Sequence, residues 1–207
     1  QVVETSHRPD IDGRLVPSLE VVETTRREPA ATRTIREVFD FDLERRRRLV
    51  ETVESFRETL ANGDSSAVHT TSAPDVNGRH AVLSRQVERT RSSPSGVHQT
   101  ETLLLVPHLS ESLRETERSL YEERRAAAGV VAHETTYSIR DVNGRWQPTE
   151  TRRGEAREVG VSERVDEETI QRLDVNGKLV DDERTVTRST SENARESAVI
   201  ETYTRAD

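Results

Sequence analysis

The chain contains 207 residues, of which 31% are hydrophobic, 3% aromatic and 34% charged, and its formal net charge is −8. Because average domains contain roughly 45–50% apolar residues, this composition excludes a thick closed core, while nearly balanced acids and bases argue against disorder and against a nucleic-acid-binding surface. The lack of cysteine excludes disulfides, thiolate metal sites and a cysteine nucleophile, and no apolar run approaches the roughly 18 residues of a membrane-spanning helix.

A short motif recurs along the chain at a fixed phase. Asp-Ile-Asp-Gly begins at residue 10, and Asp-Val-Asn-Gly begins at residues 75, 141 and 174, so the starting positions differ by multiples of about 33 residues. Such a period is typical of a tandem array, in which stacked neighbours bury what one unit cannot. The sequence therefore predicts a single repeat array over residues 1–207. Its units are 10–41, 42–74, 75–107, 108–140, 141–173 and 174–206, after a leading strand at 2–10.

Each unit is expected to contain two extended segments. Asn-Gly between alternating polar and apolar residues is a strong hairpin signal, and we expect Asn143 and Gly144 to form a type I′ turn. That turn would place four residues on one face, namely Tyr137, Ile139, Trp146 and Pro148. The expected packing anchors are Tyr137, Ile139, Trp146 and Tyr203. The residues expected to set the turns are Asp10, Gly13, Asp75, Asn77, Gly78, Asp141, Asn143, Gly144, Asp174, Asn176 and Gly177.

A looser connection rich in small residues lies about midway between the tetrads, so the chain is expected to reverse twice per unit. Threonine, valine, glutamate and arginine alternate between these connections, and Glu opposite Arg across strands contributes roughly 0.2–1 kcal/mol per pair. The predicted fold is therefore all-β, with thirteen extended segments in an antiparallel meander that forms a thin sheet or solenoid with little helix.

Two segments, residues 42–60 and 110–125, also fit a helix. Leu49, Val53 and Phe56 are spaced as on an amphipathic helix, and the Asp-x-Asn-Gly tetrad is missing from both units concerned. We favour strands because the repeat keeps its phase on both sides of each segment. A closed, propeller-like ring is a rival architecture, but its blades need more residues and more apolar content than these units have.

No recurrent constellation points to catalysis, to a cofactor or to a metal ion. Asp-x-Asn-Gly also begins calcium loops, but the fifth position here is Arg or Lys in every copy, and a cation there would repel Ca²⁺. The six histidines lack the spacing of a metal site and are expected on solvent-facing strand positions. We therefore predict no enzymatic activity and no cofactor.

The Asp-Val-Asn-Gly-Arg pentads, with the ending Tyr203 to Asp207, resemble the Tyr-Asp (YD) repeats of large secreted bacterial shell proteins. Those repeats place Asp-x-x-Gly-Arg at hairpin turns, in sheets that can wrap a cargo. The likeness covers about five residues in each of four units, and this chain departs from the pattern in its longer period and few aromatic residues. The resemblance implies an exported bacterial β-repeat protein, and no site residue is carried over from it.

The two ends of the chain are nearly the same, since residues 2–10 read VVETSHRPD and residues 199–207 read VIETYTRAD. An open edge strand is a template for another chain, and a head-to-tail contact between such edges builds an open filament. The possible assembly residues are Val2, Val3, Thr5, Val199, Ile200, Thr202 and Tyr203.

We therefore expect a structural, non-enzymatic subunit of an extracellular filament or surface stalk whose partners are copies of itself. The alternative is a secreted or cell-surface scaffold that binds glycan or protein, with Trp146 as an exposed stacking platform. The chain begins with Gln1 and contains no methionine, which predicts export with removal of a signal peptide, although a trimmed chain would look the same. Neither a nucleic-acid partner nor a membrane span is expected.

Overall fold

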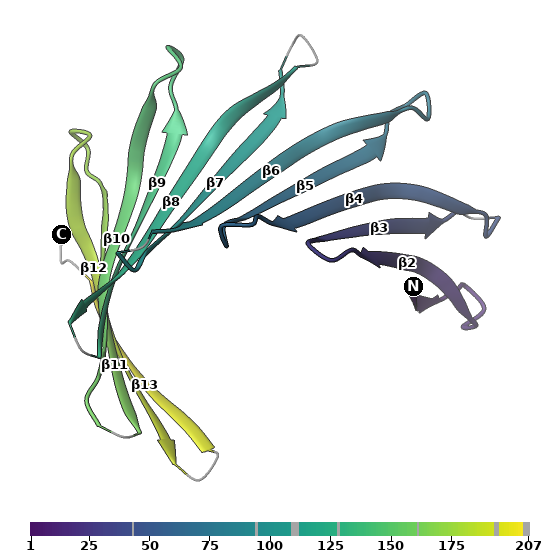
Figure 1. Ribbon diagram of the computed structural model, residues 1–207. Helices are drawn as coiled ribbons and strands as arrows, with labels where there is room; N and C mark the ends of the chain where they lie inside the picture. Colours follow the sequence, from purple (N-terminus) through teal and green to yellow (C-terminus); the bar gives the residue numbers. More distant parts are fainter. Residues whose placement is uncertain are drawn as a thin grey trace. The chain divides into compact units, whose positions relative to one another are not determined.

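The computed structural model describes residues 1–42, 44–93, 95–108, 112–127, 129–160, 162–192 and 195–204. These residues form thirteen β-strands and contain no helix (Figure 1). The strands are β1 (Val2–Pro9), β2 (Leu15–Arg27), β3 (Ala31–Phe41), β4 (Arg47–Thr59), β5 (Ser65–Pro74), β6 (His80–Ser92), β7 (Val97–Pro107), β8 (Leu113–Ala127), β9 (Val130–Arg140), β10 (Trp146–Glu158), β11 (Glu163–Leu173), β12 (Leu179–Glu192) and β13 (Arg195–Thr204).

Each strand is hydrogen-bonded to its neighbours in the chain, in the order β1 to β13. Every pairing whose register is described is antiparallel. The fold is therefore one open all-β meander, which confirms the prediction and excludes the closed ring. The helical alternative is also excluded over the described residues, because β4 and β8 occupy the two segments that fitted a helix.

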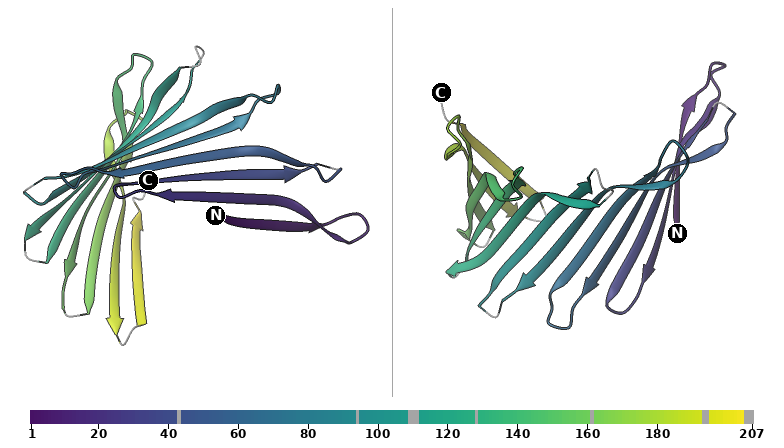
Figure 2. Two further views of the ribbon diagram at one scale, coloured as in Figure 1. Left: turned by 45° about the vertical axis from the view of Figure 1, so that its right-hand side comes forward. Right: turned by 90° about the horizontal axis from the view of Figure 1, so that it is seen from above.

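Contacts divide the chain into two compact bodies. Body 1 consists of residues 1–89 and 103–115, and body 2 consists of residues 90–102 and 116–207. Within each body, consecutive hairpins lie side by side (Figure 2). We describe each body by itself below.

A single layer of strands buries few side chains. In body 1, Val22 is 6% exposed and Val38 is 8% exposed, and they lie on opposite faces because Val38 pairs with Val21. In body 2, Ala156 and Ile170 are buried on one face. No large side chain among the described residues is fully buried. The low apolar content of the sequence therefore matches a thin sheet whose buried residues are divided between two faces.

Long charged side chains cover the small apolar ones. Ala67 is 2% exposed and pairs with Arg57, whose guanidinium lies 3.6 Å from Glu88 on β6. In the same body, the Arg47 guanidinium lies 3.4 Å from the centre of the Phe39 ring. Aliphatic stems of arginine shield apolar surface while the charged head stays in water. These stems perform part of the shielding that a second layer would otherwise provide.

An extra residue interrupts several hairpins at the same phase of the repeat. Ser18, Val50, Thr149 and Asp182 have no partner in the strand pairings, and the register shifts beside each of them. The Thr149 hydroxyl donates to the Tyr137 carbonyl at 3.3 Å, which anchors one of these bulges. A bulge bends its strand and increases the local twist. It also changes which residues of a hairpin share a face.

Candidate functional site

The loops that begin with aspartate share one hydrogen-bond pattern. In the first, Asp10 Oδ1 accepts hydrogen bonds of 2.9 Å from the N–H groups of both Asp12 and Arg14. The Gly13 N–H donates to the Asp10 carbonyl at 3.0 Å, and Gly13 has a φ of 75°. A type I turn followed by one left-handed residue gives this three-residue loop. The Oδ1 atom of Asp10 is therefore used by the backbone of its own loop.

The other sequence-predicted turn residues occupy equivalent places. Their loops begin with Asp75, Asp141 and Asp174, have Asn77, Asn143 and Asn176 in the third position, and have Gly78, Gly144 and Gly177 in the fourth. In each loop the aspartate Oδ1 accepts from the amides two and four residues later, at 2.8 to 2.9 Å. The three glycines have φ values between 73° and 80°.

The predicted type I′ turn at residues 143–144 is wrong. A type I′ turn needs positive φ at both central residues, and in the described part of the chain Arg45 is the one residue other than glycine with positive φ. Asn143 therefore lacks the required conformation. The physical reason is the Asp141 carboxylate, which holds the N–H groups of the third and fifth loop residues and so favours a three-residue loop.

The predicted apolar patch is wrong for the same reason. Trp146 lies opposite Arg140 in the register of β9 and β10, so Trp146 and Pro148 share a face with Arg140. Tyr137 and Ile139 lie on the other face. The Arg140 guanidinium instead lies 5.6 Å from the centre of the Trp146 ring, which gives Trp146 a cationic neighbour in place of an aromatic one.

The unit that begins at Asp42 has the same loop hydrogen bonds, although it lacks the Asp-x-Asn-Gly tetrad. Asp42 Oδ1 accepts from the amides two and four residues later, and Arg45 takes the place of the glycine with a φ of 61°. Hydrogen bonds from the backbone and the side chain of Arg46 hold the pKa of Asp42 below its ordinary value. In the unit that begins at His108, the corresponding residues 109–111 lie outside the described residues.

The two edges of the sheet expose the residues predicted to mediate assembly. β1 is hydrogen-bonded to β2 and β13 to β12, and neither has a second strand neighbour in the described part of the chain. Their outer backbone N–H and C=O groups are therefore open to an incoming strand. Val2, Val3, Val199, Ile200 and Tyr203 are each more than half exposed, and Thr5 and Thr202 are exposed as well.

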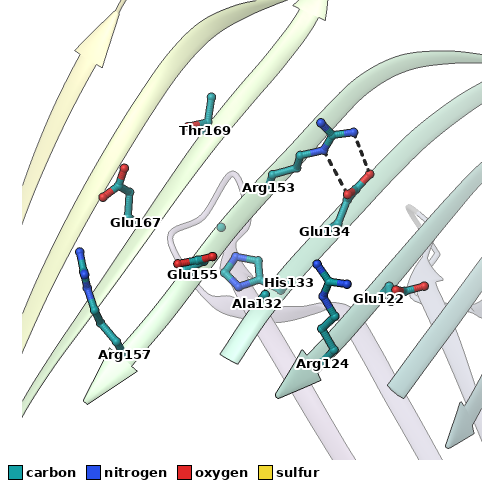
Figure 3. A pocket seen from close by; sticks show the side chains of 11 residues that line it. Glu122, Arg124, Ala132, His133, Glu134, Arg153, Glu155, Arg157, Glu167 and Thr169 are labelled. Atoms are coloured by element: carbon teal, nitrogen blue, oxygen red, sulfur yellow. Dashed lines mark hydrogen bonds and ion pairs between the residues drawn. The ribbon is translucent and has the colours of Figure 1, made fainter. Parts of the chain in front are cut away.

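A depression of about 430 Å³ lies over β8, β9, β10 and β11 of body 2 (Figure 3). Four glutamates and three arginines line it. Arg153 Nε on β10 lies 3.1 Å from Glu134 on β9, and Arg184 on β12 lies 2.7 Å from Glu167 on β11. Binding pockets for small molecules are mostly apolar and enclosed, whereas this surface is charged and Arg153 and Glu134 on it are paired with each other.

Three of the six histidines have a side-chain partner on another strand. His69 Nδ1 lies 2.8 Å from the Ser55 hydroxyl, and His133 Nε2 lies 3.7 Å from Glu168. His98 is bonded to Ser92 in the same way as His69 is to Ser55. Over the residues that the structure describes, no group of three or more histidine, aspartate or glutamate side chains is placed to hold a metal ion.

Sequence reasoning missed two features of the site. The Asp42 loop had a signal, because Asp42 follows Asp10 by about one period, but the missing glycine obscured it. The second feature is Gly154, over which the His133 ring lies. The sequence gives no signal for this contact, because the contact between Gly154 and His133 depends on the register of β9 and β10.

No family model and no curated protein matches the chain. Two solved structures are similar to it at 9% identity each. A protein of unknown function from Bacteroides fragilis aligns over 84% of this chain and 94% of its own with a TM-score of 0.35, and a porin-like protein from Bacteroides uniformis aligns over 89% and 93% with a TM-score of 0.19. At such scores neither likeness bears on function. No helix in the described residues is long and apolar enough to cross a membrane.

Proposed function

We propose that this protein is a structural, non-enzymatic subunit that assembles head to tail, through β1 and β13, into a filament or stalk outside the cell or at its surface. The observation that carries the proposal is that both edges of the sheet are open and expose nearly the same sequence. A long exposed edge with apolar side chains is a template for strand addition, which natural sheets otherwise block with charges, prolines or covering segments.

The chemistry of the two edges supports direct pairing. Every described pairing in this sheet is antiparallel, so we consider an antiparallel contact between the two edges. In one register of that contact, Val2 of one copy lies opposite Ile200 of the next. The same register places Val3 opposite Val199, so an apolar pair forms on each face of the junction. Cross-strand aromatic and β-branched pairs contribute roughly 0.2–1 kcal/mol each, and the new backbone hydrogen bonds satisfy the groups that both edges leave open.

Cysteine cross-linking tests this junction, because the chain has no cysteine of its own. In the double variant Val3→Cys/Val199→Cys, we expect mild oxidation to produce a ladder of covalent oligomers, since directly opposite residues bring their Cβ atoms within disulfide range. The two single variants are the matched controls, and both are expected to stay monomeric under denaturing, non-reducing conditions.

Two results would contradict the proposal. A double variant that remains monomeric at concentrations where the chain self-associates would exclude this junction. Dimers of the single Val199→Cys variant would indicate a two-fold contact between two β13 strands, which closes instead of growing.

A further inference from the structure

The aspartate loops carry exposed aliphatic side chains at their tips. The second residue of the loop is Ile11, Val76, Val142 or Val175, and these residues are 102%, 101%, 94% and 101% exposed. The same sequence position holds Leu43 and Leu109, which lie outside the described residues. The first central position of a type I turn accepts most residues and favours proline, so turn formation does not require an aliphatic side chain there.

The aspartate loops lie along the same end of the strands within each body. The aspartate loops join β1 to β2, β3 to β4 and β5 to β6 in body 1, and β9 to β10 and β11 to β12 in body 2. In an antiparallel meander such alternate connections fall at the same end of the strands, about 10 Å apart. Arg45 of one loop lies 3.5 Å from Asp10 of the next, which places neighbouring loops side by side.

A cation accompanies each aliphatic tip. The fifth loop residue is Arg14, Arg46, Arg79, Arg145 or Lys178, and all five are exposed. The aspartate at the first position accepts two backbone N–H groups through Oδ1, as in the pair of bonds to Asp75. The four loops that begin with Asp10, Asp75, Asp141 and Asp174 therefore each present a fully exposed aliphatic group at the tip and an exposed positive head three residues later. The carboxylate of the first loop residue is bonded to the backbone of its own loop. In the loop that begins with Asp42, the Arg46 guanidinium is instead paired with Asp42 and Glu44.

We propose that, in each body, the end of the hairpins that carries the aspartate loops binds the surface of a phospholipid bilayer. The aliphatic tips enter the boundary between headgroups and acyl chains, and the arginine and lysine heads stay at the level of the lipid phosphates. A protein groove would need a contiguous apolar patch, whereas Val142 and Val175 are separated by about two strand spacings and Ile11 and Val76 by about four. Each tip contributes little alone, but the two described tips of one body act together. The inference goes beyond self-assembly and does not depend on it.

Trp146 supplies a reporter for this contact. It is the first residue of β10, directly after the loop that carries Val142, and it is the only tryptophan in the chain. Tryptophan prefers the membrane–water interface. Its fluorescence therefore follows the environment of one tip without interference from any other tryptophan.

The test is co-sedimentation with vesicles of phosphatidylcholine that contain phosphatidylglycerol. The fluorescence emission of Trp146 is recorded in parallel. Samples without vesicles measure the self-assembled material that sediments by itself, and this amount is subtracted. The tip variant replaces Ile11, Val76, Val142 and Val175 with Asn, which is compatible with turns. The matched control replaces Leu60 and Val159 with Asn, because these residues are also exposed but lie in the loops at the other end of the strands.

We expect the intact chain and the control variant to sediment with the vesicles and to shift Trp146 emission to shorter wavelength. The tip variant is expected to bind about tenfold or more weakly, because it loses the apolar contribution of all four tips. The proposal is overturned if the intact chain stays in the supernatant at every lipid concentration. It is also overturned if the tip variant, folded by circular dichroism, binds as tightly as the control.

Discussion

The imidazole of His133 occupies the space that a side chain at Gly154 would need. A Cβ atom at residue 154 would overlap Nε2 and Cε1 of His133 and would lie 2.7 Å from the Glu167 carbonyl oxygen. With this space open, the ring lies across β10, and its Nε2 reaches to 3.7 Å from Glu168 on β11. One glycine thus allows a side chain of β9 to contact a side chain two strands away.

Gly154→Ala is therefore expected to destabilise the chain by about 1–3 kcal/mol, because overpacking forces neighbouring atoms to shift. The carbonyl of Glu167 belongs to the backbone, so moving the His133 ring relieves only part of the overlap. Urea denaturation measures the change. Gly160→Ala is the matched control, since no atom lies within 4 Å of a Cβ at that position. Equal stability of the two variants would show that the ring does not fill this space.

Arg45→Gly is expected to stabilise the chain by about 0.5–1 kcal/mol. Arg45 has a φ of 61° where the other aspartate loops have glycine, and a left-handed conformation is strained for residues with a Cβ. The variant also loses the contact with Asp10, but the Arg45 side chain is 64% exposed, and exposed ion pairs contribute little. Arg45→Ala separates the two effects because it loses the same contact without relieving the strain. If the two variants unfold at the same denaturant concentration, strain at residue 45 is not the cause.

Gly144→Val is expected to destabilise the β9–β10 hairpin by about 1–3 kcal/mol, because a β-branched residue is strained at positive φ. Gly144 has a φ of 80°. Gly144→Asn is the control, since asparagine tolerates the left-handed region. Thermal unfolding should rank the chains as native, then Asn, then Val. A valine variant as stable as the native chain would contradict the loop geometry.

The stability of body 2 is expected to fall in acid partly through Glu150. Burial raises the pKa of Glu150, but hydrogen bonds from Arg152 and Arg172 outweigh it and hold the pKa below its ordinary value. A carboxyl whose pKa is lower in the folded chain than in the unfolded chain stabilises the fold. Its contribution is complete at pH values above the pKa of the unfolded chain, about 4.3 for Glu, and is lost as the pH falls through the pKa of the folded chain. Stability should therefore decline below about pH 5.

Glu150→Gln should flatten this decline, as measured by the melting temperature between neutral pH and about pH 3. Glu155→Gln on the same strand is the control, because no arginine is bonded to Glu155 among the described residues. A native-like acid profile in the Glu150→Gln variant, or an equal flattening in the control, would rule out this carboxylate as the source.

The period of the sequence predicted most of the fold. The recurring tetrads placed the turns, and the phase they set correctly favoured strands over a helix in residues 42–60. Leu49 and Phe56 share a face of β4 while Val53 lies on the other, because the unpaired Val50 changes the alternation. The three apolar residues are therefore divided between two faces of a strand, so their helix-like spacing was misleading there.

The details of the candidate site were less predictable. The type of turn depended on the Asp141 carboxylate, which accepts hydrogen bonds from two backbone N–H groups of the loop. The dipeptide Asn143-Gly144 alone does not reveal these bonds. Whether Tyr137 and Trp146 share a face depended on the same turn, because the three-residue loop sets Trp146 opposite Arg140. The role of the edge strands is a property of two chains, and a single sequence indicates only that the edges are alike.

Assembly through the edges is the central claim, and negative-stain electron microscopy tests it most directly. The intact chain and a chain lacking residues 1–9 would be compared at neutral pH across a concentration series. We predict long fibres of uniform width for the intact chain, and discrete particles with unchanged β-sheet content for the chain that lacks β1. Discrete particles of the intact chain at every concentration, or fibres that survive the deletion, would contradict the account.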